Sequence, residues 1–394
     1  MCSTPARQFV ALISVTLLGL SPLSLAYEPQ GVSKTEIVLG TLQDLSGPLA
    51  PLGAPLRNGL QMRLDEANER GGVHGRKLRM VVEDTGYDPR KAVLATQKLI
   101  QNDKIFATIG NLGSAVVNAT MTNFLDAGIP HLFPAAPQSN TYEPRHMLKF
   151  AITPAYSVTT PLAAKYLVMQ NGYKKIGVLY QDDDYGQDVV KGIEAMAREL
   201  NVGLCEKLSY KRGATDFSSQ IARLKAADCD FLVLATVVRE TIGAYAAART
   251  QGWKVPMLVT VAGYTAQIHQ LGGATMDGLY AALLTPHPYP DAGNKALQAW
   301  IENYRKRYAV EPNTWSVLGY SAADLLVRSL DRAGPALTVD RMVSALESIR
   351  TSGDIFGSPA YSFTPGDHLA SRAVRVAQIR NGRWEIVSDN LELK

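Results

Sequence analysis

Cysteine is scarce in this chain of 394 residues, and the three that occur, Cys2, Cys205 and Cys229, form no C-x-x-C pair. Their spacing excludes the thiol clusters that hold structural zinc or carry dithiol redox chemistry. Cys205 and Cys229 lie in or beside apolar, strand-like runs. They are compatible with a disulfide in an oxidising compartment and equally with two buried thiols.

Motifs that mark catalysis or cofactor binding are also missing. The chain has no G-x-S-x-G, no H-E-x-x-H and no P-loop, and Gly110-x-x-Gly113 lacks the third glycine of a dinucleotide fingerprint. His131 lies in a short strand-like run and could face a binding cleft, but a hydrogen-bonded structural histidine is the better-supported alternative. The residues 182–184 are three aspartates without the spacing of a calcium loop, and they indicate a polar loop and helix N-cap. We therefore predict no enzymatic activity, no metal and no cofactor.

No single sign of charge dominates this chain. Its 40 basic and 36 acidic residues give a formal net charge of +4 without a basic cluster, which argues against a nucleic-acid partner.

A long apolar run occurs only at the start, where Arg7 precedes the apolar residues 9–20 and the small-x-small pattern Ser24-Leu25-Ala26. This pattern predicts a secretory signal peptide over residues 1–26, cleaved near Ala26. We expect a soluble, periplasmic chain of 368 residues, 394 less the 26 removed, without a lipid anchor because Tyr27 would come first.

Strand-like and helix-like segments alternate through the rest of the chain. The first series has strands at 36–42, 77–84, 104–109 and 130–133 and helices at 57–70, 89–102 and 114–127. The second has strands at 175–180, 202–209, 229–235 and 256–260 and helices at 186–200, 216–227 and 240–251. Helices at 292–308, 314–333 and 339–350 and a hairpin at 373–379 and 383–387 follow. This α/β rhythm predicts two doubly wound parallel-sheet domains with a cleft between them.

The turn from Gly110 to Ser114 joins a strand to a helix. The first turn of such a helix offers unpaired N–H groups and the positive end of its dipole, and the Ser114 hydroxyl adds a donor. A carboxylate fits there. The alternative, better supported by this stretch alone, is that Ser114 caps its own helix.

Several short motifs, weak one by one, recur in the order and spacing of a known family. They are Ser46-Gly47-Pro48 followed by Gly53, Asn68-x-x-Gly71-Gly72, Asp84 with Asp88-Pro89, Ile109-Gly110 before Ser114, Pro134-Ala135-Ala136, Tyr185-Gly186 and Asp216-Phe217. From about residue 35 to about 380, the chain resembles the periplasmic solute-binding proteins of the branched-chain amino-acid (leucine/isoleucine/valine-binding) type.

The resemblance implies a type I periplasmic binding protein, with two domains joined by three crossing segments near 150–154, 283–288 and 357–363. The N-terminal lobe would comprise 27–152 plus 287–356, and the C-terminal lobe 153–286 plus 357–394. A small-molecule ligand would bind in the cleft by hinge closure. A monomer would then deliver it to an ABC permease in the membrane.

The resemblance also implies roles for single residues. Ser114, with Gly113 beside it and backbone from Ala135 and Ala136, would hold a ligand's carboxylate. Tyr185 would line the opposite lobe, the alternative being that it packs within its own domain.

Departures from the family pattern concern the rest of the site. The acidic residue that pairs the ligand's ammonium falls at Val261, a hydroxyl residue near the carboxylate is Pro137, and two cleft tyrosines fall at Leu52 and Val237. A buried ammonium without a partner costs several kcal/mol. Glu240 and the aspartates 182–184 are the nearest acids in sequence, and neither is a persuasive substitute.

One further departure affects two positions together. The family's cysteine pair falls at Tyr87 and Gly113, so that disulfide is absent. Tyr87 points toward the cleft mouth or packs on the surface.

The resulting hypothesis is the extracytoplasmic binding component of an ABC-type importer. Its ligand is a small carboxylate or amino-acid-like molecule, but not an ordinary branched-chain amino acid. The alternative is a sensory ligand-binding protein that acts through a separate membrane partner.

Overall fold

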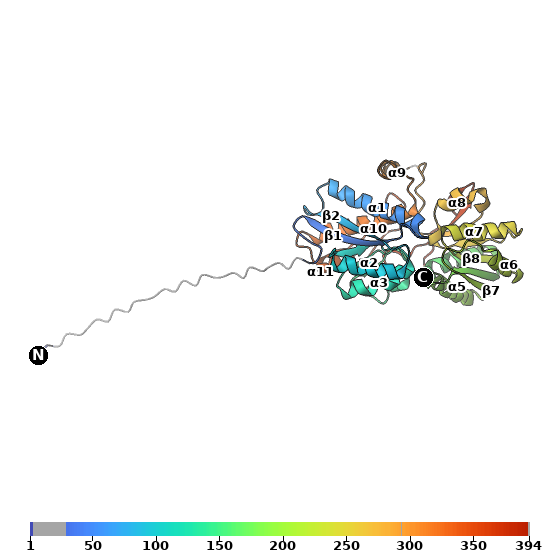
Figure 1. Cartoon of the computed structure of the whole chain (residues 1–394), viewed down its shortest axis with the longest axis horizontal. Helices are drawn as coiled ribbons and strands as arrows, with labels where there is room; N and C mark the ends of the chain where they lie inside the picture. The colour runs from blue at the N-terminus through green and yellow to red at the C-terminus, as the bar shows by residue number, and fades with distance from the viewer. Residues whose placement is uncertain (3–28, 293, 393–394) are drawn as a thin grey trace.

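The computed structural model describes residues 1–2, 29–292 and 294–392 and contains two lobes side by side (Figure 1). The predicted signal peptide and its cleavage site near Ala26 lie outside these residues. Within the part of the chain that is described, no helix has the length and apolar character needed to cross a membrane.

The first lobe is built on a five-stranded parallel sheet of order β2-β1-β3-β4-β5. Its strands are β1 (Glu36–Gln43), β2 (Lys77–Asp84), β3 (Ala107–Ile109), β4 (His131–Leu132) and β5 (Lys149–Phe150). Its helices are α1 (Ala50–Glu69), α2 (Pro89–Gln101), α3 (Ser114–Asp126), α9 (Lys295–Tyr308), α10 (Thr314–Ala333) and α11 (Val339–Glu347). Helix α10 packs along α1, which brings a late part of the chain back onto the first sheet.

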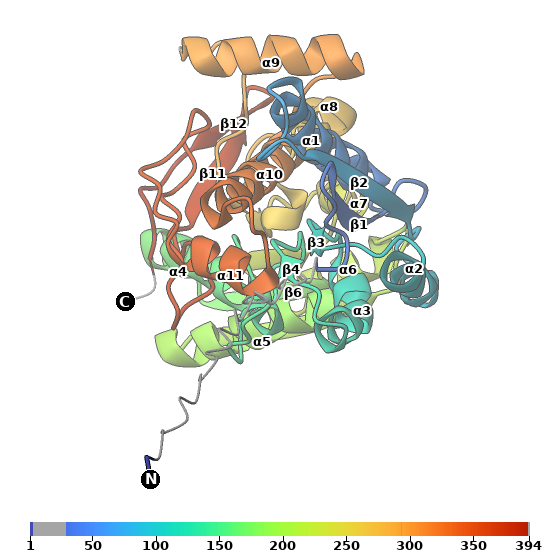
Figure 2. The same ribbon diagram turned by 90° about the vertical axis from the view of Figure 1, so that its left-hand side faces the viewer.

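Helix α9 lies outside the sheet, across one side of the first lobe (Figure 2). It buries Leu297, Trp300 and Tyr304 against Met62 of α1, in a small apolar cluster separate from the main core.

The second lobe is built on a seven-stranded sheet of order β12-β11-β10-β9-β8-β6-β7. Its strands are β6 (Lys175–Gln181), β7 (Gly203–Tyr210), β8 (Phe231–Ala235), β9 (Met257–Val259), β10 (Tyr280–Leu283), β11 (Arg375–Arg380) and β12 (Arg383–Ile386). Its helices are α4 (Tyr156–Asn171), α5 (Asp184–Leu200), α6 (Ser218–Ala226), α7 (Val238–Thr250) and α8 (Gln267–Gly272). Strand β11 pairs antiparallel with both β10 and β12, and β11 and β12 form the terminal hairpin that the Asn381-Gly382 turn predicts.

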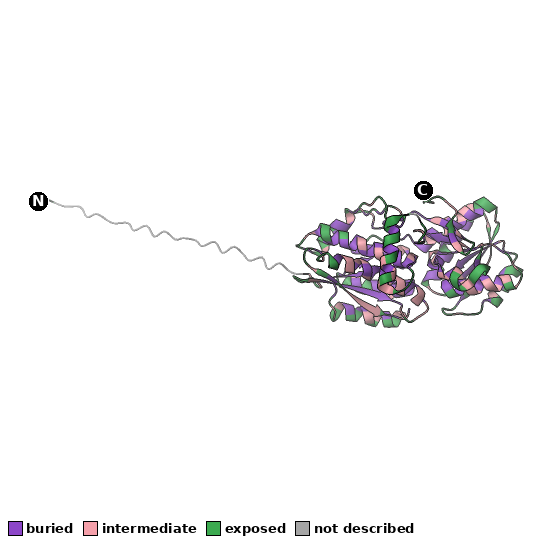
Figure 3. Ribbon diagram, turned by 90° about the horizontal axis from the view of Figure 1, so that it is seen from above, coloured by how far each residue is buried: buried purple, intermediate pink, exposed green. Residues whose placement is uncertain are grey.

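The buried strands occupy the interior of each lobe, and the exposed faces of the helices point outward (Figure 3). The apolar run of β8 is buried at all five positions, as expected for a central parallel strand. The α/β fold with two mainly parallel sheets is therefore as predicted. The domain boundaries given above stay a prediction.

Local capping explains where several helices begin. Asp183 caps α5 by accepting hydrogen bonds from the amides of Tyr185 (3.1 Å) and Gly186 (3.4 Å), as the aspartate run indicated. Asn313 and Ser316 form a capping box at the start of α10. The sequence misplaced the start of α1, which begins at Ala50 rather than at residue 57, because Pro51 in the first turn needs no amide partner. It also gave no prediction for α4.

The interpretation of Ser114 as the cap of its own helix is wrong. Gly113 occupies the N-cap position of α3 with φ of 93°, and Ser114 is the first helical residue. A Cβ atom at Gly113 would lie 2.5 Å from Cε2 of Tyr87, so the tyrosine ring rests directly on the glycine.

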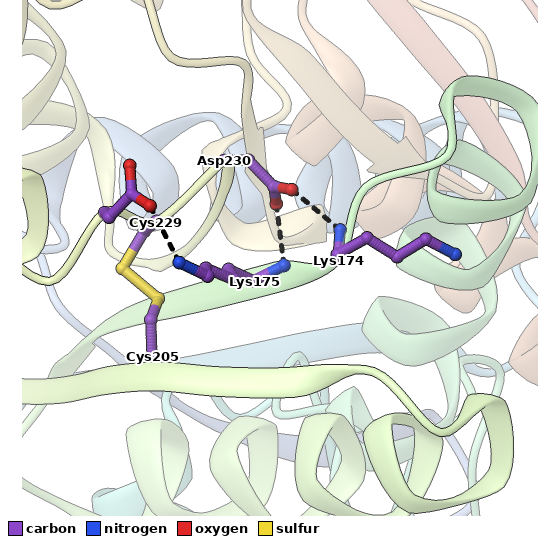
Figure 4. Close-up of a disulfide and its surroundings, with 6 residues drawn as sticks. Lys174, Lys175, Cys205, Cys229 and Asp230 are labelled. Carbon is purple, nitrogen blue, oxygen red and sulfur yellow. Dashed lines mark hydrogen bonds and ion pairs between the residues drawn. A yellow bond between two sulfur atoms is a disulfide. The ribbon is translucent and has the colours of Figure 1, made fainter.

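The question left open for the cysteines is settled by the structure. Cys205 in β7 and Cys229, just before β8, form a disulfide with a Cα–Cα distance of 5.7 Å (Figure 4). Beside it, the Asp230 carboxylate accepts hydrogen bonds of 2.8 Å from the amides of Lys174 and Lys175, which ties β6 to the same turn.

Candidate functional site

A cavity of about 60 Å³ lies where the two lobes meet. Its walls come from the first lobe, from the second lobe and from the three segments predicted to cross between them. The lining residues are Ala135, Pro137, Thr153, Val261, Tyr264, Leu283, Leu284, Thr285, Thr314, Trp315, Leu318, Ser321 and Tyr361. None of them carries a charged side chain.

The polar side-chain groups in this wall are hydroxyls and the indole N–H of Trp315, and most of the hydroxyls already have partners. Thr314 Oγ1 donates to the Tyr264 carbonyl at 2.8 Å, and the Tyr264 hydroxyl accepts from the His287 amide at 3.1 Å. Thr285 Oγ1 lies 3.0 Å from Ser358 Oγ. A charged group placed in the cavity would therefore find no opposite charge on its walls.

The predicted anion cradle lies beside this cavity. Leu112 and Ala135 form a parallel bridge, and the Gly113 amide donates to the Ala135 carbonyl at 3.2 Å, so the start of α3 adjoins the loop after β4. Ser114 is only 3% exposed, and its hydroxyl has no hydrogen-bond partner among the described residues. Together with the unpaired amides of the first turn of α3, it forms a set of donors suited to an anion.

The structure separates the eight predicted site residues into groups. Ala135 and Val261 line the cavity, and Gly113, Ser114 and Ala136 lie next to its wall without lining it. Leu52 in α1 and Val237 before α7 are buried and do not line the cavity.

The side chain of Tyr185 makes its contacts within the second lobe. Its hydroxyl lies 2.6 Å from Thr260 Oγ1 and 3.2 Å from the Thr236 carbonyl, and its ring meets that of Tyr156 edge-on at 4.6 Å. Burial raises the pKa of the Tyr185 hydroxyl well above its usual value, so the group keeps its proton. This is the packing alternative, and a ligand contact of Tyr185 stays a prediction.

Three residues that we call the mouth cluster, Tyr87, Asp183 and Arg212, connect the lobes outside the wall of the cavity. The Tyr87 hydroxyl donates to Asp183 Oδ2 at 3.2 Å, and Arg212 donates to the same carboxylate (3.0 Å) and to the Tyr87 carbonyl (3.0 Å). The guanidinium also lies 4.5 Å from the centre of the Tyr87 ring. Burial and the nearby Asp183 raise the pKa of the Tyr87 hydroxyl, so it acts as a neutral donor.

Two more hydrogen bonds cross between the lobes. Gln138 Nε2 donates to the Asp184 carbonyl at 3.2 Å, and the Thr314–Tyr264 bond described above joins two residues of the cavity wall. The lobes are thus in contact both at the cavity wall and away from it, in a closed arrangement.

Neither acidic substitute for Val261 reaches the cavity wall. Glu240 is buried in the first turn of α7, where burial raises its pKa and Oε2 has no partner among the described residues, but it does not line the cavity. Asp183 already serves the mouth cluster and the cap of α5.

His131 is fully buried with its Nε2 3.2 Å from Asn111 Nδ2, and burial, with nearby Lys149, lowers its pKa to about 3. It is a neutral structural residue, as interpreted from the sequence. The described ranges hold no group of three or more histidine, cysteine, aspartate or glutamate side chains able to bind a metal.

Much of the wall was missed from the sequence. Trp315, Leu318 and Ser321 lie on α10, whose extent was predicted but whose cleft-facing side was not. The Asn313 cap marks where the helix starts, but no local signal in the sequence shows which side of the helix faces the cleft.

Comparisons with known proteins agree with this geometry. The sequence model of a family described as periplasmic binding protein matches residues 36–383. The Leu/Ile/Val-binding protein homolog 7 of Brucella abortus is 25% identical over 330 residues, which cover 80% of this chain and 82% of the relative.

Two solved structures share the fold. A fatty acid ABC transporter substrate-binding protein from Thermomonospora curvata superposes with a TM-score of 0.83 and 27% identity, over 93% of this chain and 95% of that one. An ABC transporter solute-binding protein from R. palustris, in complex with benzoate, superposes with a TM-score of 0.77 and 19% identity, over 91% and 96%.

Proposed function

This chain belongs to the periplasmic binding protein family, of the Leu/Ile/Val-binding type, and from that premise we propose that it binds a small carboxylate with an apolar body in its cleft. The ligand would be passed to an ABC permease by a monomeric carrier in the periplasm, released from its signal peptide near Ala26. No catalytic step is part of this role.

The observation that carries the proposal is the uncharged wall of the cavity. Val261 occupies the position at which the family resemblance implies an acidic partner for an ammonium group, and no other wall residue supplies a carboxylate. Burial of an unpaired ammonium costs several kcal/mol. An ordinary leucine or valine zwitterion is therefore disfavoured.

The donors at the start of α3 support the carboxylate-binding half of such a site. The free Ser114 hydroxyl and the first-turn amides of α3 offer hydrogen bonds to a carboxylate, and the helix dipole favours a negative charge there. The similar protein from Thermomonospora curvata is a fatty acid ABC transporter substrate-binding protein. Because a fatty acid is a carboxylate with an apolar body, that likeness supports the same class of ligand here.

Closure of the lobes would couple binding to recognition by the permease. The mouth cluster stabilises the closed arrangement, because its interlobe contacts are lost when the lobes part. A bound ligand that touches both lobes would shift the population in the same direction.

Mass spectrometry of small molecules that co-purify with the native protein tests this function. We expect an organic acid without an amine. Recovery of leucine, isoleucine or valine would contradict the proposal.

A further inference from the structure

A second cavity, of about 220 Å³, adjoins the first and shares Ser321 and Tyr361 with it. One wall is α10, and the other is the chain from Thr351 to Phe356. The remaining lining residues are Tyr320, Asp324, Leu325, Arg328, Thr351, Gly353, Asp354, Ile355 and Phe356.

The sizes of the two cavities decide how a ligand is accommodated. A protein cavity of about 150 Å³ accepts a benzene molecule. The first cavity, at about 60 Å³, is too small for an apolar body of that size when the lobes are closed, whereas the second is large enough. The second cavity is the neighbouring space into which a ligand of six or more carbons held in the closed cleft can extend, past the residues shared by both cavities.

Those two residues differ in how firmly they are held. Tyr361 is buried beside Thr285 and Ser358, whose hydroxyls lie 3.0 Å apart. Ser321 is 6% exposed, and its buried Oγ has no hydrogen-bond partner among the described residues. The partition on the α10 side is thus a small buried side chain whose hydroxyl makes no hydrogen bond that a passing chain would break.

The second cavity suits an apolar tail. Leu325 and Phe356 are buried in its wall. The charges at its rim satisfy one another, since Arg328 Nε lies 2.6 Å from Asp324 Oδ2. Asp354 Oδ1 accepts from the amides of Phe356 and Ser358, so no rim carboxylate needs a charged ligand group.

We propose that the second cavity is a tail subsite: the carboxylate of the ligand binds at Ser114 and its apolar chain passes Ser321 into the space between α10 and residues 351–356. This inference rests on the proposed function and makes it more specific. The preferred ligands are elongated monocarboxylates, and Ser321 sets the width of the passage.

Calorimetric titration of ligand-free protein with butanoate and octanoate tests the subsite. We expect octanoate to bind the unmodified chain at least tenfold more tightly than butanoate, because only the longer chain reaches the second cavity. Ser321→Leu fills the passage and, because Ser321 lines the first cavity as well, is expected to weaken octanoate binding at least tenfold more than butanoate binding. Ser321→Ala is the matched control, which removes the hydroxyl but keeps the passage open and retains octanoate binding.

A second variant, at a residue outside the first cavity, shows whether weaker octanoate binding by Ser321→Leu comes from the blocked passage or from misfolding. Leu325→Trp narrows only the second cavity, and it is expected to weaken octanoate binding while melting cooperatively. Equal affinity for both acids, or octanoate binding that survives both Ser321→Leu and Leu325→Trp, would overturn the subsite and leave the proposed function standing. Absence of binding for every carboxylate would overturn the proposed function itself, and the subsite with it.

Discussion

Replacing Tyr87 with phenylalanine removes one interlobe hydrogen bond and little else. The ring stays on Gly113 and under the Arg212 guanidinium, whose distance of 4.5 Å from the ring centre does not depend on the hydroxyl. The lost contact is the 3.2 Å bond to Asp183 Oδ2.

The magnitude follows from the charge and burial of the acceptor. A hydrogen bond to a charged group contributes about 1.5 to 3 kcal/mol, and the Asp183 side chain is only 5% exposed, so solvent screening is weak. In the variant, Asp183 still accepts hydrogen bonds from Arg212 (3.0 Å) and from Gln181 Nε2 (2.6 Å). The stabilisation lost from the closed form is therefore near the lower end of that range, at about 1.5 kcal/mol. Because only the closed form makes this bond, the closed population should fall roughly tenfold relative to the open one.

The assay compares distances between the lobes. Spin labels on cysteines introduced at the exposed Leu94 of α2 and Lys191 of α5 report the closed and open populations. Tyr210→Phe is the control, since the Tyr210 hydroxyl donates to the Ala235 carbonyl (3.2 Å) within the second lobe. Identical distance distributions in Tyr87→Phe and the unmodified chain, or an equal shift in the Tyr210 control, would refute this account of closure.

Three further predictions concern the carboxylate cradle, acid stability and the disulfide. Ser114→Ala should weaken binding of a carboxylate by about 1.5 to 3 kcal/mol, roughly ten- to a hundredfold by calorimetry, and an unchanged affinity would remove Ser114 from the site. Burial lowers the folded pKa of His131 and of His287 to about 3, so only the unfolded chain takes up their protons as the pH falls below about 6.5, and stability is lost from there toward pH 3. In urea unfolding, the free energy of unfolding of His131→Gln should therefore fall by about 2 kcal/mol less than that of the unmodified chain between pH 7 and pH 5. An equal fall in both proteins would contradict the buried neutral state of His131. Reduction of the Cys205–Cys229 disulfide, which closes a loop of sequence separation 24, should lower the free energy of unfolding by about 3 kcal/mol, whereas the double serine variant should be insensitive to reductant. An unfolding free energy unchanged by reduction would contradict a structural role for this disulfide.

Regular elements were predictable where burial imposes a pattern on the sequence. The strand at 77–84 and the helix at 314–333 have the predicted bounds, because apolar spacing and capping residues are local signals. Errors arose where a local signal competes with context: the helical pattern from residue 57 onward gave too late a start for α1, and the positive φ of Gly113 puts the N-cap at Gly113 rather than at Ser114.

The site was less predictable because it depends on how distant segments meet. The substitutions at Tyr87 and Gly113 were visible as a pair, but not that the ring rests on the glycine or that its hydroxyl reaches Asp183 of the other lobe. Ser321 and Tyr361 are 40 positions apart and share a wall only through the packing of α10 against the residues after α11. No periodicity in the sequence encodes that contact.

Calorimetric titration of the ligand-free protein with octanoate and with leucine, side by side, tests the central claim most directly. The uncharged cavity wall and the free donors at Ser114 predict binding of octanoate and no measurable heat from leucine. Tight binding of leucine without binding of octanoate would contradict the claim, because it would require a partner for the buried ammonium that this cleft does not provide.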